Sequence, residues 1–224
     1  MLTRASEALL DAIRTRNAEA VETLLSSDAG PSAHGGPGGE SLVLYACYVG
    51  AVDLAPTLRG SRPYDACEAA ALGNLASLNE ALDRDADLIS RRSGDGWTPL
   101  HLAGFFGRDD CAAYLIDNGA PLAALSTNAT RNTPLHAALA GATNATLVRR
   151  LVFAGADVEA RGEGGFQPLH LAASRGDQML CDLLISRGAD PHATTDDGTK
   201  PADLARKRGF EEVAKHLEAK GITD

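Results

Sequence analysis

The sequence predicts an all-α solenoid, a stack of short antiparallel helix pairs, and three observations predict it. A Pro-Leu-His motif and its degenerate last copy recur with proline spacings of 35, 34 and 33 residues, at Pro99, Pro134, Pro168 and Pro201. A glycine stands eight residues after three of these prolines, at Gly107, Gly176 and Gly209. Apolar residues then follow at spacings of three and four, as on one face of a helix. A fixed period of this length is typical of proteins whose units pack only on their neighbours.

The elements of one unit can be followed over residues 97–120. Thr98 is a predicted N-cap of the first helix, and Pro99 occupies a first-turn position that needs no N–H. Gly107 is expected to form the turn into the second helix. Gly119 is expected to end that helix in the left-handed conformation. Asp-Gly pairs ahead of two of the prolines predict tight turns in the connections between units.

The three clearest copies of the motif resemble the ankyrin repeat, which runs G-x-T-P-L-H-x-A-A, then G, an apolar helix and G-A-D; they are Trp97–Ala103, Asn132–Ala138 and Phe166–Ala173. The chain resembles small ankyrin repeat proteins of the bacterial type. The resemblance implies two antiparallel helices per unit, joined to the next by a β-hairpin finger. It also implies that the recurring histidines bond backbone of the neighbouring repeat and bind no metal: His101, His136 and His170.

We expect one domain over residues 1–224, with about seven units when both caps are counted. Its parts are an N-terminal cap (1–26), a Gly/Pro-rich loop (27–40), central repeats (41–194) and a C-terminal cap (195–224). Gly50 and Gly73 are only 23 residues apart, so the unit between them is expected to lack a full finger. The connection over residues 122–132 is two residues longer than the later fingers.

The amino-acid composition disfavours several classes of function. Lys and Arg number 21 against 30 Asp and Glu, a formal net charge of -9, which disfavours nucleic-acid binding because that needs clustered cations. No apolar run approaches the roughly 18 residues that span a bilayer, and the first residues lack a secretory pattern. The four cysteines are widely spaced, as expected of buried thiols in a reducing compartment. We therefore expect a cytoplasmic monomer that binds neither membrane nor nucleic acid.

No catalytic motif is present in the sequence. It contains no G-x-S-x-G, no HExxH, no P-loop and no G-x-G-x-x-G after a strand. We expect no enzymatic activity, no cofactor and no metal. Catalysis or small-molecule binding would require a single convergent pocket with perturbed titratable groups.

The resemblance implies instead a partner protein or peptide bound in a concave groove that is lined by first helices and fingers. By motif position the candidate residues are Trp97, Phe105, Phe106, Asn128, Arg131, Asn132, Phe166 and Arg175. The aromatic middle and the cationic end, with Lys207 and Arg208, would suit an acidic segment. Two alternatives stay open: Trp97 and Phe105 simply cover a neighbouring repeat, or the protein is an inhibitor or regulatory subunit that occludes an enzyme with its Asn128 finger.

Overall fold

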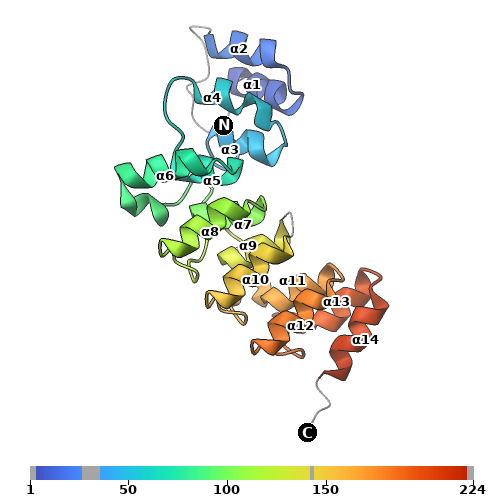
Figure 1. The fold of residues 1–224 in the computed structure, drawn as a ribbon. Helices are drawn as coiled ribbons and strands as arrows, with labels where there is room; N and C mark the ends of the chain where they lie inside the picture. Colours follow the sequence, from blue (N-terminus) through green and yellow to red (C-terminus); the bar gives the residue numbers. More distant parts are fainter. Residues whose placement is uncertain (1–3, 27–35, 142–143, 221–224) are drawn as a thin grey trace. The chain divides into compact units, whose positions relative to one another are not determined.

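The computed structural model describes residues 4–26, 36–141 and 144–220. The chain divides into two compact units, residues 1–99 and 100–224, which are described separately below. Within the described residues every regular element is a helix and no strand occurs, which confirms the all-α prediction (Figure 1). None of the described helices is both long and apolar enough to cross a membrane. The expected loop over residues 27–40 lies outside the description except for its last five residues.

The first unit consists of short helices that pack in consecutive pairs, α1 on α2, α3 on α4 and α5 on α6. Their bounds are α1 Arg4–Arg14, α2 Ala18–Ser26, α3 Leu42–Tyr48, η1 Val52–Leu54, α4 Ala55–Arg59, α5 Ala66–Leu72, α6 Leu75–Arg84 and η2 Ala86–Ile89. Apolar side chains of α1 to α4 form one buried cluster, including Leu9, Ile13, Val21, Val43 and Leu54. Only six residues join α4 to α5, in agreement with the predicted absence of a full finger there.

Helix α5 shows why the first-unit helices begin and end where they do. The Asp65 carboxylate caps the helix by accepting a hydrogen bond from the Glu68 N–H, at 2.8 Å, and the Glu68 carboxylate accepts from the Asp65 N–H. This reciprocal pair satisfies two amide donors that a helix start leaves open. Gly73 ends the helix at φ 77°, a conformation that side chains disfavour.

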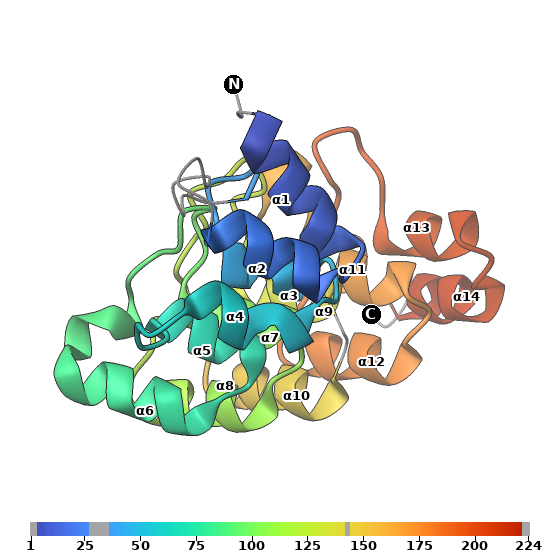
Figure 2. The same cartoon turned by 90° about the horizontal axis from the view of Figure 1, so that it is seen from above.

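In its described residues the second unit contains four first helices and four second helices in alternation. Their bounds are α7 Pro99–Phe105, α8 Asp109–Asp117, α9 Pro134–Ala140, α10 Ala145–Phe153, α11 Pro168–Ser174, α12 Gln178–Ser186, α13 Pro201–Lys207 and α14 Glu211–Ala219, with η3 at Glu163–Gly165. In both views α7, α9, α11 and α13 follow one another in one layer, and α8, α10, α12 and α14 in a second (Figures 1 and 2). Leucines and alanines from both layers form the buried core.

Small residues let the first helices approach one another closely. A side chain at Gly104 of α7 would lie 3.2 Å from the carbonyl oxygen of Pro134, at the start of α9. Thr133 caps α9 through its hydroxyl, as the motif predicts. The number of complete repeats and the single domain remain predictions.

The fingers contain no assigned strand in the residues that the structure describes. Each is closed by a backbone hydrogen bond; the closures are Gly36 N to Glu40 O (2.6 Å), Ser93 N to Trp97 O (2.8 Å), Ser126 N to Asn132 O (2.8 Å), Gly162 N to Phe166 O (2.8 Å) and Thr195 N to Thr199 O (3.0 Å). The third closure spans two residues more than the others, because that connection is longer. No strand forms in the described residues, so the hairpin form of the fingers is not confirmed.

Backbone also joins successive fingers of the second unit at their tips. The Glu163 N–H donates to the Thr130 carbonyl at 2.9 Å, and the Asp196 N–H donates to the Gly164 carbonyl at 2.8 Å. The motif histidines add a second tie at the finger bases. Their Nε2 atoms lie 2.8 to 3.2 Å from the carbonyl oxygens of the next repeat: His101 with Asn132, His136 with Phe166 and His170 with Thr199. The histidine role implied by the resemblance is thereby confirmed.

Candidate functional site

Of the eight predicted partner-binding residues, Trp97 lies in the first unit and the other seven lie in the second. Trp97 is largely buried, with only 8% of the residue exposed, which favours the alternative that its side chain covers neighbouring structure. Its carbonyl closes the finger by accepting from the Ser93 N–H, and it also lies 3.8 Å from the Cys67 thiol of α5. The finger thus folds back on its own unit and takes Trp97 out of the solvent.

Four predicted residues gather at the fingers of the second unit, and we call them the finger cluster: Asn128, Arg131, Asn132 and Phe166. The Asn128 side-chain oxygen accepts hydrogen bonds from the Ser126 hydroxyl (2.8 Å) and from both the amide (3.2 Å) and the hydroxyl (2.6 Å) of Thr130. Asn128 therefore holds the shape of the longer finger rather than offering this oxygen to a partner.

Arg131 follows at the exposed end of that finger and has an unfavourable backbone. Its φ is 46°, in the left-handed region, which a residue with a Cβ enters at a cost of about 1 kcal/mol. Its N–H bonds only weakly to the Asn128 carbonyl, at 3.3 Å. A strained residue with an exposed side chain at a loop tip is a candidate for contact with a partner.

Asn132 and Phe166 occupy the bases of neighbouring fingers, where their carbonyls accept from the motif histidines. Phe166 is 37% exposed and its ring meets the ring of His170 edge-on, with centroids 5.9 Å apart. Burial lowers the pKa of His136 and of His170 below the usual value, so both rings are neutral at pH 7. Since carbonyls only accept, the proton of each neutral ring resides on Nε2.

The remaining three predicted residues lie at the ends of first helices in the second unit. The half-buried rings of Phe105 and Phe106 pack edge-to-face, with centroids 5.2 Å apart. A side chain at Gly141, after α9, would collide with the Phe105 carbonyl, so these two helix ends touch. Arg175, after α11, donates from Nη1 to the Gly141 carbonyl at 3.3 Å. The structure therefore brings Phe105, Phe106 and Arg175 into one row, the helix-end row.

An open pocket of about 290 Å³ continues this row toward α13, and we call it the helix-end pocket. Its lining residues are Leu139, Ala140, Leu171, Ser174, Arg175 and Arg208. The sequence indicated Arg175 and Arg208 as groove residues but missed Leu139 and Leu171. Leu171 follows the motif histidine, at a position that is Leu, Ala and Leu in the three clear copies. This variation between copies is the one sequence feature that could have indicated Leu171 as a surface residue.

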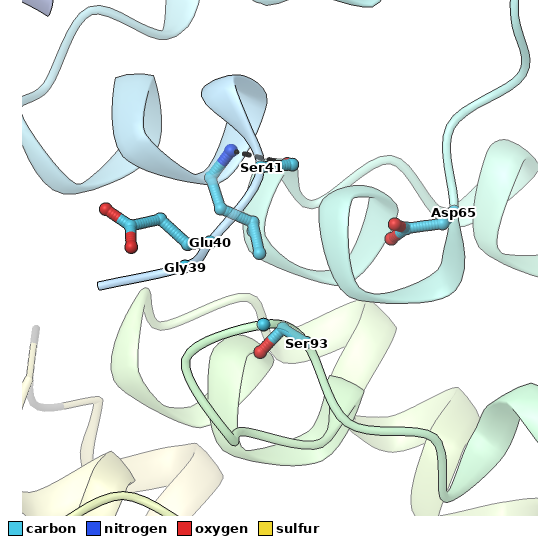
Figure 3. Close-up of a pocket in the computed structure, with 7 residues that line it drawn as sticks. Gly39, Glu40, Ser41, Asp65 and Ser93 are labelled. Atoms are coloured by element: carbon cyan, nitrogen blue, oxygen red, sulfur yellow. Dashed lines mark hydrogen bonds between the residues drawn. The ribbon is translucent and has the colours of Figure 1, made fainter. Parts of the chain in front are cut away.

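The first unit has a separate open pocket of about 340 Å³ that the sequence did not indicate (Figure 3). It lies between two fingers and the starts of α3 and α5, and its lining includes Glu40, Ser41, Asp65 and Ser93. In Figure 3 the Glu40 carboxylate points away from Asp65, so the two acids do not converge on one point. Within the described residues no group of three or more His, Cys, Asp or Glu is placed to hold a metal ion.

Next to this pocket, a buried acid is fully occupied by its neighbours. Glu68 is inaccessible to solvent, and its carboxylate accepts from both terminal nitrogens of Arg62 (2.6 and 2.7 Å) and from the Ser41 hydroxyl (2.7 Å). Burial alone would raise the pKa of Glu68, but these hydrogen bonds outweigh it and the pKa is lowered. An ionised, fully bonded carboxylate is a structural element and is unsuited to general acid catalysis.

The four cysteines are free and buried, as the sequence predicts. Burial raises the pKa of the Cys111 thiol to about 11 and that of Cys181 to about 12. Both thiols therefore stay protonated at neutral pH, and a protonated thiol is a poor nucleophile.

Comparison with known proteins agrees with the repeat pattern. The family model for ankyrin repeats in three copies matches residues 66–162 and 139–223. Similar proteins include a putative ankyrin repeat-containing protein of Treponema pallidum (38% identical over 113 residues, 50% of this chain and 37% of the relative). They also include the Target of rapamycin complex 2 subunit AVO2 of Saccharomyces cerevisiae (34% over 119 residues, 53% and 28%). A third is the mouse Ankyrin repeat and SOCS box protein 16 (36% over 95 residues, 39% and 20%).

These matches span little more than a third of each relative at most, so they concern the repeats and not the whole of those proteins. The family model, in contrast, covers well over half of this chain. Together with the recurring Pro-Leu-His motif, the alternating helices and the histidine bonds between repeats, it shows that the chain belongs to the ankyrin repeat family.

Proposed function

We propose that the chain is a non-catalytic protein-binding module whose partner contacts the finger cluster and the helix-end row of the second unit. The observation that carries the proposal is the row itself, in which two aromatic rings of the α7 repeat and an arginine of the α11 repeat are joined through Gly141 of the repeat between them. Half-exposed aromatic residues next to arginine are the usual composition of binding hot spots.

The family supports the same conclusion at a coarser level. Ankyrin repeats generally mediate protein–protein interaction, and the family is typically non-catalytic. One relative is by its name a subunit of a complex, which is compatible with a role in assembly. The identity of the partner is to be found by experiment, with the finger cluster and the helix-end row as the surface to test.

The test is affinity capture from a lysate of the source cells with the full chain as bait. Phe166→Ala is compared with the wild type and with Phe153→Ala, an equal change at an exposed phenylalanine on the second-helix layer. We expect a specific partner to be captured by the wild type and by Phe153→Ala but not by Phe166→Ala, with circular dichroism equal for all three. Capture by all three baits would exclude Phe166 from the binding surface.

A second candidate function is the occlusion of an enzyme's active site. It is favoured by the longer finger of residues 126–132, which is fixed internally by Asn128 and presents Arg131 to solvent. If the captured partner is an enzyme, adding the wild-type chain should inhibit it and Arg131→Ala should inhibit it less. If a saturating concentration of the wild-type chain does not slow the enzyme, the inhibitor function is excluded and the scaffold function is retained.

A further inference from the structure

We propose that the helix-end pocket of the second unit binds an acidic peptide segment of the partner, with one carboxylate held between Arg175 and Arg208. This inference deepens the proposed function and rests on it, because it assigns the partner a chemistry. The occupant is a short extended segment with an Asp or Glu next to an apolar residue.

The two arginines come from adjacent, equivalent places in the fold. Arg175 is the C-cap of α11 and Arg208 is the C-cap of α13, and these two helices pack directly on each other. Both side chains line the same pocket of about 290 Å³. Guanidinium groups from two helices can donate to one carboxylate from two sides, which a single surface arginine cannot do.

Neither arginine has an acidic partner within the part of the chain that the structure describes. The Arg175 side chain donates to the Gly141 carbonyl, and no hydrogen bond or ion pair involves the Arg208 side chain. Arg206, on the same helix, shows the contrast, because it lies within 4 Å of three carboxylates: Asp203 at 3.8 Å, Glu211 at 3.4 Å and Glu218 at 2.8 Å. On a chain with a net charge of -9, two uncompensated arginines in one pocket mark a local cationic site.

The helix ends around the pocket do not cancel this charge. Carbonyl groups at a helix C-terminus carry partial negative charge when they are left open. Here the following turns satisfy several of them: the Gly176 N–H donates to Ala173, the Gly209 N–H to Arg206 and the Phe210 N–H to Ala205. The two full charges therefore dominate the local field.

The rest of the lining favours a peptide over a small free anion. Of the two lining leucines, Leu171 is partly exposed and supplies the apolar wall, whereas Leu139 is fully buried. Ser174 adds a hydroxyl at the edge of the pocket. The Ser174 hydroxyl donates to the Leu171 carbonyl within its helix, so its oxygen still offers an acceptor for a peptide N–H. An anion without an apolar neighbour would leave the leucine wall uncovered.

The experiment uses the full ¹⁵N-labelled chain and the capped peptide acetyl-Ala-Glu-Leu-Glu-Ala-amide, followed by NMR at low ionic strength. The glutamine counterpart of the peptide and inorganic phosphate are parallel probes. We expect the acidic peptide to shift the Nε–H signals of Arg175 and Arg208 and neighbouring amides, and the other two probes to leave them in place. The affinity should fall steeply with added salt.

Two double variants with the same loss of charge make the test specific. Arg175→Gln with Arg208→Gln should weaken the peptide at least tenfold. Arg149→Gln with Arg150→Gln, an exposed pair on α10 in the other layer, should change the affinity by less than twofold. Equal losses in the two variants, shifts caused equally by the glutamine peptide or by phosphate, or no shift at all would overturn the proposal.

These outcomes are separable from a failure of the proposed function. If the peptide does not bind but Phe166→Ala still loses the captured partner, the binding module stands and only its acidic specificity falls. If the peptide binds as expected but Phe166→Ala still captures the partner, the pocket is retained and the contact with the finger cluster is wrong.

Discussion

At the residue scale, the clearest conflict between folding and function is Arg131. A glycine would adopt its φ of 46° without strain, yet the chain carries a long cationic side chain there. Folding alone gives no reason for arginine at this position, because the neighbouring turn is held by Asn128 and Thr130. Arg131 therefore adds backbone strain without adding a contact that stabilises the turn, and the effect on the free energy of unfolding can be measured.

Arg131→Gly should raise the free energy of unfolding by about 1 kcal/mol, because it removes the left-handed strain. The same change should weaken partner capture, since it removes the exposed side chain. Urea unfolding followed by circular dichroism gives the first quantity and the capture assay gives the second. Arg161→Gly, at a neighbouring exposed arginine without positive φ, serves as the control and should not gain stability. A loss of stability in Arg131→Gly would contradict the strain argument.

Arg62→Met should lower the free energy of unfolding by about 2 kcal/mol, because it leaves the buried Glu68 carboxylate with too few donors. The figure is below that for a fully buried pair, since the Arg62 side chain is 46% exposed. Adding Glu68→Met should recover part of the loss, as an apolar pair needs no hydrogen bonds. Urea unfolding detected by Trp97 fluorescence measures the stability of the first unit, which contains Arg62, Glu68 and Trp97. A double variant that is no more stable than Arg62→Met would contradict the argument that the unpaired carboxylate causes the loss.

At the element scale, the histidine bonds tie each first helix to the next finger and make the stack sensitive to acid. His136 and His170 have lowered pKa values in the folded protein, so below pH 6.5 the unfolded chain binds protons that the folded chain does not. Their stabilisation is therefore complete above pH 6.5 and is lost as the pH falls through their folded pKa values.

The free energy of unfolding should consequently decrease between pH 7 and pH 5.5. His136→Gln should flatten this dependence. His192→Gln, at an exposed histidine after the α12 unit, should leave it unchanged. Urea titrations at three pH values measure all three proteins. An equal slope in His136→Gln and in the wild type would refute the assignment.

Elements with strong local signals were predictable from sequence, and those set by contacts between elements were not. The Thr-Pro pair before α9 and the glycine after α5 are local signals, and α9 begins and α5 ends where those residues indicate. Trp97 occupies the same motif position as Phe166, yet one is buried and the other is partly exposed. That difference in exposure depends on how each finger packs against its own unit. The position of a residue within the motif does not determine this packing. The open pocket beside Glu40 depends on two fingers distant in sequence and gave no signal.

At the scale of the whole molecule, the chain has two compact units but only one tryptophan, which is buried in the first. In repeat proteins each unit contacts only its neighbours, so a local cavity need not destabilise distant repeats. Trp97 fluorescence therefore reports the first unit, and circular dichroism reports the helices of both.

Leu78→Ala in the first unit should lower the urea midpoint of Trp97 fluorescence, because it leaves a cavity at a fully buried site. Leu184→Ala in the second unit, equally buried, should lower the circular dichroism midpoint and leave the fluorescence transition nearly in place. If each variant shifts both probes by the same amount, the two units unfold together, as a single domain over residues 1–224 requires.

The tip-to-tip bonds between the fingers have a consequence for how such a surface can change. They join the Glu163 amide to the Thr130 carbonyl and the Asp196 amide to the Gly164 carbonyl, so they use no side chain. These two bonds are thus chemically independent of the side chains that the tips display. Substitutions at the tips can therefore change the binding specificity while these backbone bonds are retained. This holds for evolution and for a mutagenesis library restricted to Arg131, Glu163 and Asp196.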